Sequence, residues 1–271
     1  MQNPLQSLDP KSFDSAKRGR FEGVTNIVLF NWPMYVAGLI VSGVGTYLVR
    51  IGLPRPWRMV AKIAAGLSFG YLANSLLVSH CIYDRSWLYQ WRWIRALLPQ
   101  TPNRIVNVHA GFDESSAALQ QLFPDAELKV LDFYDPTHHA EPSIERARRY
   151  RPAAIPAERI DAVSWGTEPE SAELIFLFLA AHEIRHQDDR IAFFRQAGQT
   201  LSPGGSVVVV EHLRDRSNFL AYGPGFLHFH SRRTWMNTFS KAGLALKRTF
   251  RITPFINVFQ LMRSDPVNHG S

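Results

Sequence analysis

The chain has 271 residues, a formal net charge of +7 and 46% hydrophobic residues. It contains no internal repeat and no low-complexity tract, and its length allows one soluble domain with a good core beside a further segment. The single cysteine, Cys81, excludes an internal disulfide and a zinc site built from several cysteines.

Two long stretches near the N-terminus, 24–49 and 63–83, contain no charged residue. Each exceeds the roughly 20 residues that cross a hydrocarbon core of ~30 Å, so we expect two membrane helices. A signal peptide is disfavoured, because the first stretch starts late and lacks a small-x-small cleavage site before Arg50. Two buried helices of a soluble protein are the alternative.

The two apolar stretches carry signals for a kink and for close packing. Asn31 and Pro33 predict a kink near the start of the first stretch. Small residues four apart let two helices approach closely in lipid. The pairs are Gly38 with Ser42 and Gly66 with Gly70.

Positive charge is concentrated around the apolar stretches. Residues 1–103 carry 11 Lys and Arg against 4 Asp and Glu, whereas 104–271 carry 19 of each. Basic residues beside apolar helices are attracted to anionic lipid, so we expect a lipid bilayer as a partner and no nucleic acid. More basic residues flank the two stretches than separate them, which favours a cytoplasmic domain on a bacterial inner membrane. A hairpin dipping into one leaflet is the alternative.

The chain is therefore divided into four segments. These are a basic N-terminal segment 1–23, a membrane helical hairpin 24–83, an interfacial amphipathic connector 84–103 and a folded domain 104–271. The connector places tryptophan and tyrosine beside arginine, which suits the membrane interface and equally a helix that caps the folded domain.

The folded domain alternates between short apolar runs and helical patterns. Strands are expected at 104–108, 128–131, 159–163, 174–179 and 207–210. Helices are expected at 115–122, 144–151, 188–201 and 231–242. The alternating segments 246–252 and 258–262 should pair antiparallel. This order implies an α/β fold with a doubly wound, mostly parallel sheet.

Three motifs resemble the class I S-adenosylmethionine-dependent methyltransferases. Asp132 ends the second strand about 20 residues after Gly111, as expected of a nucleoside-binding βαβ unit. The segment 201–205, Leu-Ser-Pro-Gly-Gly, is similar to that family's L-x-P-G-G turn, and 241–244, Lys-Ala-Gly-Leu, is similar to its x-A-G-F turn. The resemblance covers about 93–263 and implies a seven-stranded, Rossmann-like methyltransferase fold that closes with an antiparallel hairpin.

The first glycine turn departs from the family pattern V-L-D-V-G-x-G-T-G. Gly111 is retained, but His109 and Asp113 stand where the family has glycine. Glycine lets the backbone approach a ligand closely, so these side chains narrow the approach to the methionine part of the cofactor.

The resemblance implies S-adenosylmethionine as the cofactor and assigns residues to it. Asp132 would accept hydrogen bonds from both ribose hydroxyls, and Phe133 would stack on the adenine. The other cofactor residues implied are His109, Ala110 and Gly111 at the methionine end, Asp161 and Ala162 near the adenine amino group, and Leu179 and Ala180 through their backbone.

Polar side chains follow the two central strands, where an open α/β sheet binds its ligands. A histidine near neutral pKa can remove a proton from an acceptor, and a carboxylate can orient it. The expected catalytic residues are His182, His212, Glu211 and His228. The expected substrate-binding residues, for an anionic or polar group, are Arg185, Arg214, Asn218 and His230. The sequence predicts no metal, because no His-x-x-x-His or Glu-x-x-His signature falls on one expected helix, although these groups also permit a metal site.

The sequence thus predicts a membrane-anchored methyltransferase that acts on a hydrophobic small molecule. Candidate acceptors are a fatty-acid carboxylate, a quinol or a lipophilic metabolite, and the acceptor atom and the oligomeric state stay open. One alternative is a non-catalytic membrane protein whose degenerate methyltransferase fold binds a nucleoside or a partner. Another is a dinucleotide oxidoreductase, which the missing Gly-x-Gly-x-x-Gly disfavours.

Overall fold

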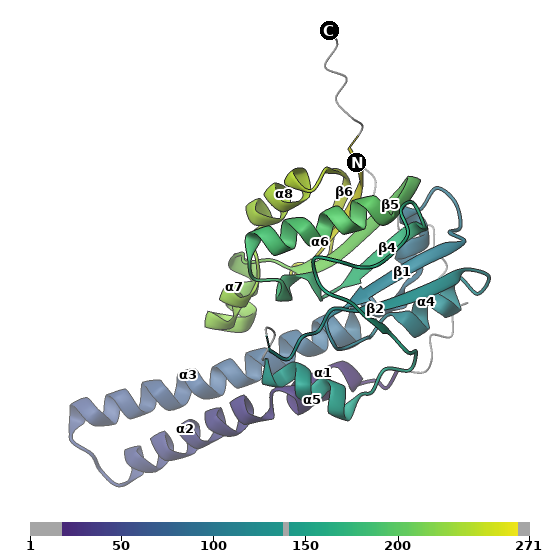
Figure 1. Cartoon of the computed structure of the whole chain (residues 1–271). Helices are drawn as coiled ribbons and strands as arrows, with labels where there is room; N and C mark the ends of the chain where they lie inside the picture. The colour runs from purple at the N-terminus through teal and green to yellow at the C-terminus, as the bar shows by residue number, and fades with distance from the viewer. Residues whose placement is uncertain (1–17, 138–140, 265–271) are drawn as a thin grey trace.

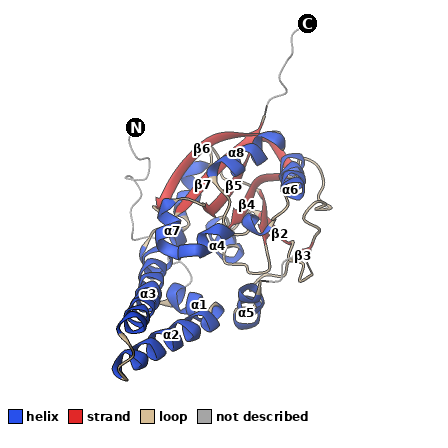
Figure 2. Cartoon of the chain, turned by 90° about the vertical axis from the view of Figure 1, so that its left-hand side faces the viewer, coloured by secondary structure: helices blue, strands red, loops and turns tan. Residues whose placement is uncertain are grey.

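The computed structural model describes residues 18–137 and 141–264, so most of the predicted N-terminal segment 1–23 lies outside the described residues. Within them, seven strands form one sheet in the order β3-β2-β1-β4-β5-β7-β6 (Figures 1 and 2). The strands are β1 Arg104–His109, β2 Glu127–Asp132, β3 Glu158–Arg159, β4 Ala172–Phe178, β5 Leu201–His212, β6 Leu244–Thr253 and β7 Ile256–Arg263.

The pairing of the strands confirms the predicted fold. Strands β1 to β5 run parallel, whereas β7 inserts antiparallel between β5 and β6. This is the Rossmann-like methyltransferase fold, closed by the antiparallel hairpin that the resemblance implies.

The two central strands are apolar because both of their faces are covered. Val207 and Val209 of β5 pack under helices α6 (Gln187–Thr200) and α8 (Arg232–Lys241). Val208 packs on the opposite face, together with Trp91 and Trp93 from the connector. Trp93 is 2% exposed, so the connector caps the folded domain, which is one of its two expected roles.

All four helices predicted in the folded domain are present, and two local features differ from the expectation. Helices α4 (Ser116–Leu122), α5 (Pro142–Tyr150), α6 and α8 lie where the pattern places them. Helix α7 (Arg216–Tyr222) was not predicted, and it begins with the Asp215 side chain accepting the N–H of Asn218 at 2.9 Å. The predicted turn at 203–205 is a bulge within β5, because Ala172 pairs with Leu201 but Leu174 pairs with Ser206.

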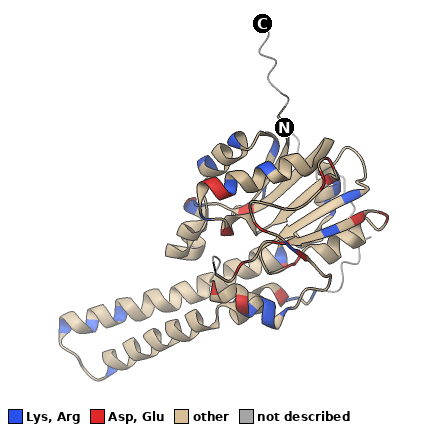
Figure 3. Ribbon diagram, in the orientation of Figure 1, with Lys and Arg blue, Asp and Glu red and all other residues tan. Residues whose placement is uncertain are grey.

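The first apolar stretch forms two helices, α1 (Glu22–Phe30) and α2 (Trp32–Arg50), with the expected break at Asn31. Helix α3 (Arg55–His80) returns antiparallel to α2, and the pair projects far from the sheet (Figure 1). Within the described residues, two helices are long and apolar enough to cross a membrane, and 11% and 17% of their apolar windows are buried. Figure 3 shows Lys and Arg at the far end of this hairpin.

Close packing of the hairpin depends on two glycines of α2. A Cβ on Gly38 would lie 2.9 Å from the side chain of Leu72, and one on Gly45 would lie 2.9 Å from Ala61 O and Ala65 Cβ. The expectation was wrong for Gly66 and Gly70, where an added Cβ would meet no described atom within 4 Å.

Helix α1 belongs to the folded domain more than to the projecting hairpin. It lies beside α5, below the sheet in Figure 2. Its first turn is capped by a residue far away in the sequence: Asp84 Oδ1 accepts the N–H of Gly23 at 2.6 Å, and Oδ2 accepts that of Val24 at 3.1 Å. Its last residue, Phe30, accepts a hydrogen bond at its carbonyl from Arg146 of α5. Both ends of α1 are therefore held by the domain.

Candidate active site

A cavity of about 260 Å³ lies at the carboxyl ends of the parallel strands. Its floor includes Ala110 after β1, Ala180 after β4 and His212 at the end of β5. The backbone turns sharply at Leu179, whose φ of 51° is rarely adopted by a branched side chain. One wall comes from helix α1 through Ile27, Phe30 and Asn31. The base of the apolar hairpin and the crest of the sheet therefore share this cavity.

His182 lies on the cavity and is bound to a fully buried carboxylate. Its Nδ1 is 2.7 Å from Glu211 Oε2, and its backbone N–H donates to Glu211 Oε1 at 3.1 Å. Burial alone would lower the pKa of His182, but Glu211 and Glu183 outweigh it and raise the pKa to about 10. His182 is therefore an imidazolium at neutral pH.

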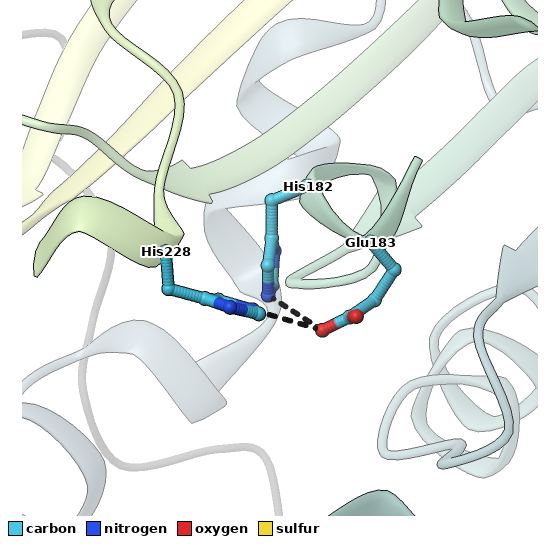
Figure 4. A group of neighbouring side chains, drawn as sticks. All are labelled: His182, Glu183 and His228. Carbon is cyan, nitrogen blue, oxygen red and sulfur yellow. Dashed lines mark hydrogen bonds and ion pairs between the residues drawn. The ribbon is translucent and has the colours of Figure 1, made fainter. Parts of the chain in front are cut away.

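His228 faces His182 across the cavity and comes from the turn Gly223–His228. Its Nδ1 is 2.9 Å from Glu141 Oε1, and its Nε2 is 3.2 Å from Glu183 Oε1. Burial lowers the pKa of His228, but hydrogen bonds to these two carboxylates raise it overall. Figure 4 shows both imidazoles directed at the same oxygen of Glu183.

The carboxylate of Glu183 is held in its ionised form. Burial would raise the pKa of Glu183, but hydrogen bonds from His182 and His228 keep it well below its ordinary value. Arg185 adds a further positive group, because its guanidinium contacts the imidazole and the backbone carbonyl of His228. On the cavity floor, Glu183 therefore lies between two imidazoles, and Arg185 lies beside them in the lining of the second cavity described below.

His212 has a different electrostatic character. Burial, with a smaller effect from His182, lowers the pKa of His212 to about 3, so the ring is neutral. Its Nδ1 lies 3.1 Å from the carbonyl oxygen of Phe255, which can only accept, so Nδ1 carries the proton. Nε2 then accepts a hydrogen bond from Tyr83 Oη at 2.9 Å. Tyr83 also lines the cavity, and no sequence motif indicated it.

Three of the residues expected to bind substrate make hydrogen bonds to the loops around the cavity instead of lining it. In the part of the chain that the structure describes, Arg214, Asn218 and His230 lie outside the linings of this cavity and of the second one described below. Arg214 Nε donates to the carbonyl of Phe229 at 2.8 Å, and its N–H donates to that of His230 at 3.0 Å. Asn218 Oδ1 is 3.1 Å from His212 Nδ1.

A second cavity of about 650 Å³ lies beside the first, beyond the end of β2. Its lining includes Tyr134, Asp161 and Ala162, and its size is typical of small-molecule sites. Phe133 also belongs to this lining, and its ring is 1% exposed and packs edge-to-face on Phe193. Its stacking on the adenine stays a prediction.

Asp132 lies at the end of β2 with both oxygens engaged. Oδ1 accepts the N–H groups of Gly111 at 2.8 Å and of Tyr134 at 2.9 Å, and Oδ2 accepts from Arg148 Nη1 at 2.8 Å. Gly111 has a φ of +84°, and a Cβ there would lie 2.9 Å from the Tyr134 ring. His109 is 4% exposed, and its ring nitrogens have no hydrogen-bond partner among the described residues.

No protein-family model and no curated protein matches the chain. Among solved structures, a protein from Pyrococcus horikoshii is 11% identical with a TM-score of 0.49, over 64% of this chain and 86% of that chain. A methyltransferase dependent on S-adenosylmethionine from Mesorhizobium loti is 22% identical with a TM-score of 0.44, over 64% and 97%. Geranyl diphosphate C-methyltransferase from Streptomyces coelicolor, solved with Mg²⁺, geranyl diphosphate and S-adenosylhomocysteine, is 12% identical with a TM-score of 0.49, over 70% and 83%. These similarities are distant and concern the fold.

Proposed function

We propose that this protein is a membrane-anchored S-adenosylmethionine-dependent methyltransferase that methylates an anionic oxygen of a hydrophobic small molecule. One observation carries the proposal: a single cavity is lined by the crest of the sheet, by His182 and His228, and by the helix that leads into the apolar hairpin. A lipophilic acceptor would reach this cavity from a bilayer without crossing water.

The nucleoside end of the cofactor fits the second cavity. Asp132 is outside the lining of this cavity but accepts the N–H of Tyr134, which lines it. A carboxylate has about four acceptor sites, of which three are used by N–H donors. Ribose hydroxyls would take the place of Arg148 at Oδ2, while the backbone N–H groups keep Oδ1 in place. When bound, S-adenosylmethionine supplies an electrophilic methyl group on a sulfonium.

The charges on the cavity floor favour an acceptor that is already ionised. With a pKa of about 10, His182 holds a proton at neutral pH and is suited to bind an anionic oxygen rather than to remove a proton. A carboxylate acceptor needs no base: its oxygen bonds to the methyl carbon as the carbon–sulfur bond breaks, and no proton moves. We therefore place a fatty-acid carboxylate first among the acceptors.

The walls of the cavity suit an apolar chain. Ile27, Phe30 and Phe178 line it. Tyr222, the last residue of helix α7, lines it as well. Helix α7 is held against the hairpin, because Asn74 Nδ2 donates to the carbonyl of Leu220 at 2.8 Å. Leu220 is 73% exposed beside this contact.

The second candidate is a non-catalytic domain that binds a nucleoside or a partner. It is favoured by His109 and Asp113, which replace glycines of the family pattern, and by the ion pair between Arg148 and Asp132.

Two measurements on the full-length protein in detergent separate the candidates. Calorimetry with S-adenosylhomocysteine should give one binding site per chain, and a labelled methyl donor should transfer label to a long-chain fatty acid. Binding without transfer to any lipid extract would favour the non-catalytic domain. Absence of binding would contradict the proposed cofactor.

A further inference from the structure

We propose that His182, Glu183 and His228 form a binding site for one divalent transition-metal ion. The site lies on the floor of the cavity of about 260 Å³, which is called the acceptor cavity below. The sequence predicts no metal here, because the ligands do not share a helix. The fold brings them together from the loop after β4 and from the turn Gly223–His228. One ligand atom from each residue lies within 4.8 Å of the other two.

The ligand atoms have the spacing of a coordination sphere. Nε2 of His182 and Nε2 of His228 each lie 3.2 Å from Glu183 Oε1 (Figure 4). Two ligand atoms that are each ~2.1 Å from one ion, at an angle of about 100°, are ~3.2 Å apart. An ion could therefore bind with small side-chain movements.

The Nδ1 atom of each histidine, which would not bind the ion, contacts a carboxylate, as is common in metal sites. His182 Nδ1 is 2.7 Å from Glu211, which is fully buried, and His228 Nδ1 is 2.9 Å from Glu141. A metal-binding histidine commonly donates its other N–H to a carboxylate, which fixes its tautomer and its orientation. Here both histidines have such a partner, and both Nε2 atoms face the same oxygen.

The charge of the cluster matches a divalent ion. Three carboxylates, those of Glu141, Glu183 and Glu211, surround two imidazoles and the guanidinium of Arg185. A bound ion would replace the Nε2 proton of His182. With both imidazoles then neutral, the cluster has two negative charges in excess, which one divalent ion would neutralise. Arg185 Nη2 lies 2.8 Å from His228 Nε2 and would move aside, which its 40% exposed side chain permits.

Two imidazoles and one carboxylate select the class of ion. This ligand set suits Zn²⁺, Fe²⁺, Mn²⁺ or Co²⁺ better than Mg²⁺ or Ca²⁺, which prefer oxygen ligands. Three protein ligands leave at least one position for another group, and all three residues line the acceptor cavity. If the proposed function is correct, this position would bind the acceptor oxygen; the binding of the metal itself does not depend on that function.

The test uses full-length protein in detergent, freed of metal with a chelator and then dialysed. Titration with CoCl₂ alone should show one Co²⁺ per chain, with visible ligand-field absorption of a site that contains nitrogen ligands. Glu183→Gln and His228→Ala should each weaken Co²⁺ binding by at least tenfold, and Glu211→Gln by roughly 10- to 100-fold. His186→Ala is the matched control, because His186 is exposed and close in sequence but outside the cluster, and it should bind Co²⁺ as the wild type does.

Circular dichroism and thermal melting establish that each variant is folded. If the wild type binds no Co²⁺, or if a folded Glu183→Gln and a folded His228→Ala both bind it as tightly as the wild type, the site does not exist. A protein that binds one Co²⁺ but transfers no methyl group would contradict the proposed function and support the metal site.

Discussion

Arg148 donates a hydrogen bond across 2.8 Å to Oδ2 of Asp132, the carboxylate that the family resemblance assigns to the ribose of the cofactor. The guanidinium lies over the ring of Tyr134 at 4.8 Å, and its Nη1 is 3.2 Å from the carbonyl of Gly111. Arg148 therefore covers the group that should bind the sugar.

Substitutions at these two positions should have opposite effects on cofactor binding. Asp132→Asn should weaken binding of S-adenosylhomocysteine by about 10-fold or more, because hydrogen bonds to a charged group contribute roughly 1.5–3 kcal/mol. Arg148→Gln should tighten it by up to about fivefold, since the partly exposed ion pair that must break is worth at most ~1 kcal/mol. Calorimetry measures both. Equal weakening in both variants would mean that Arg148 supports the site instead of covering it.

The pair of His182 and Glu211 predicts a pH dependence of stability. The pKa of His182 is about 10 in the folded protein and near 6.5 when unfolded, so the folded state binds this proton more tightly. Its contribution to stability is therefore complete below pH 6.5 and is lost as the pH rises through about 10. Glu211→Gln removes a carboxylate that raises the pKa of His182. Between pH 6.5 and 10 the free energy of unfolding should therefore fall less in this variant than in the wild type, by roughly 1–3 kcal/mol.

Denaturant unfolding followed by tryptophan fluorescence, in buffer with a chelator, measures this difference. Glu173→Gln is the matched control, because Glu173 is an ordinary surface carboxylate that pairs with Arg104. The proposed pairing is wrong if wild type and Glu211→Gln lose the same stability between these pH values.

The projecting hairpin should attach the protein to membranes through its exposed apolar side chains. Leu39 of α2 is 60% exposed and Leu67 of α3 is 70% exposed. Lysine at the centre of a membrane helix costs roughly 2.5–3.5 kcal/mol, so Leu39→Lys with Leu67→Lys should move the protein from the membrane pellet to the supernatant. The matched alanine pair should stay in the pellet, and all forms should bind S-adenosylhomocysteine. A lysine pair that still sediments with membranes would contradict the anchor.

Phe30 should select acceptors by their apolar chain. It lies at the end of α1, lines the acceptor cavity and packs edge-to-face on Phe112 with ring centres 5.1 Å apart. Phe30→Ala should lower kcat/KM for a long-chain acceptor by about tenfold or more, because apolar contacts in a pocket contribute roughly 1–3 kcal/mol. S-adenosylhomocysteine should bind unchanged. Phe21→Ala, at the exposed start of the same helix, is the control, and an equal loss there would point to a general effect on α1.

The sequence predicted the sheet well, because strands that are buried on both faces consist of apolar residues and can be recognised by them. Val207 and its neighbours in β5 are buried on both faces, which requires an unbroken apolar run. Helix α7 was missed because its sequence lacks the apolar periodicity that revealed the equally short α4. The uncharged stretch 24–49 was read as one span, but α1 avoids charge because it packs on the domain and lines the cavity.

The candidate site was predicted less completely, because a sequence carries no distances. His182, His212 and His228 were named from strand ends and a loop, and all three line one cavity. Glu141 was not named, since its approach to His228 depends on how α5 is placed against the sheet. Phe133 was named from its place after Asp132, and it lines the second cavity although its ring packs on Phe193.

Helix α1 is fixed at its start by Asp84 and at its end by Arg146, and α2 begins two residues after it. No flexible linker therefore separates the wall of the acceptor cavity from the projecting helices. In a bilayer of different thickness these helices would tilt to match it. Such a tilt would shift α1 and change the width of the cavity, so the choice of acceptor chain length would depend on the lipid in which the protein resides.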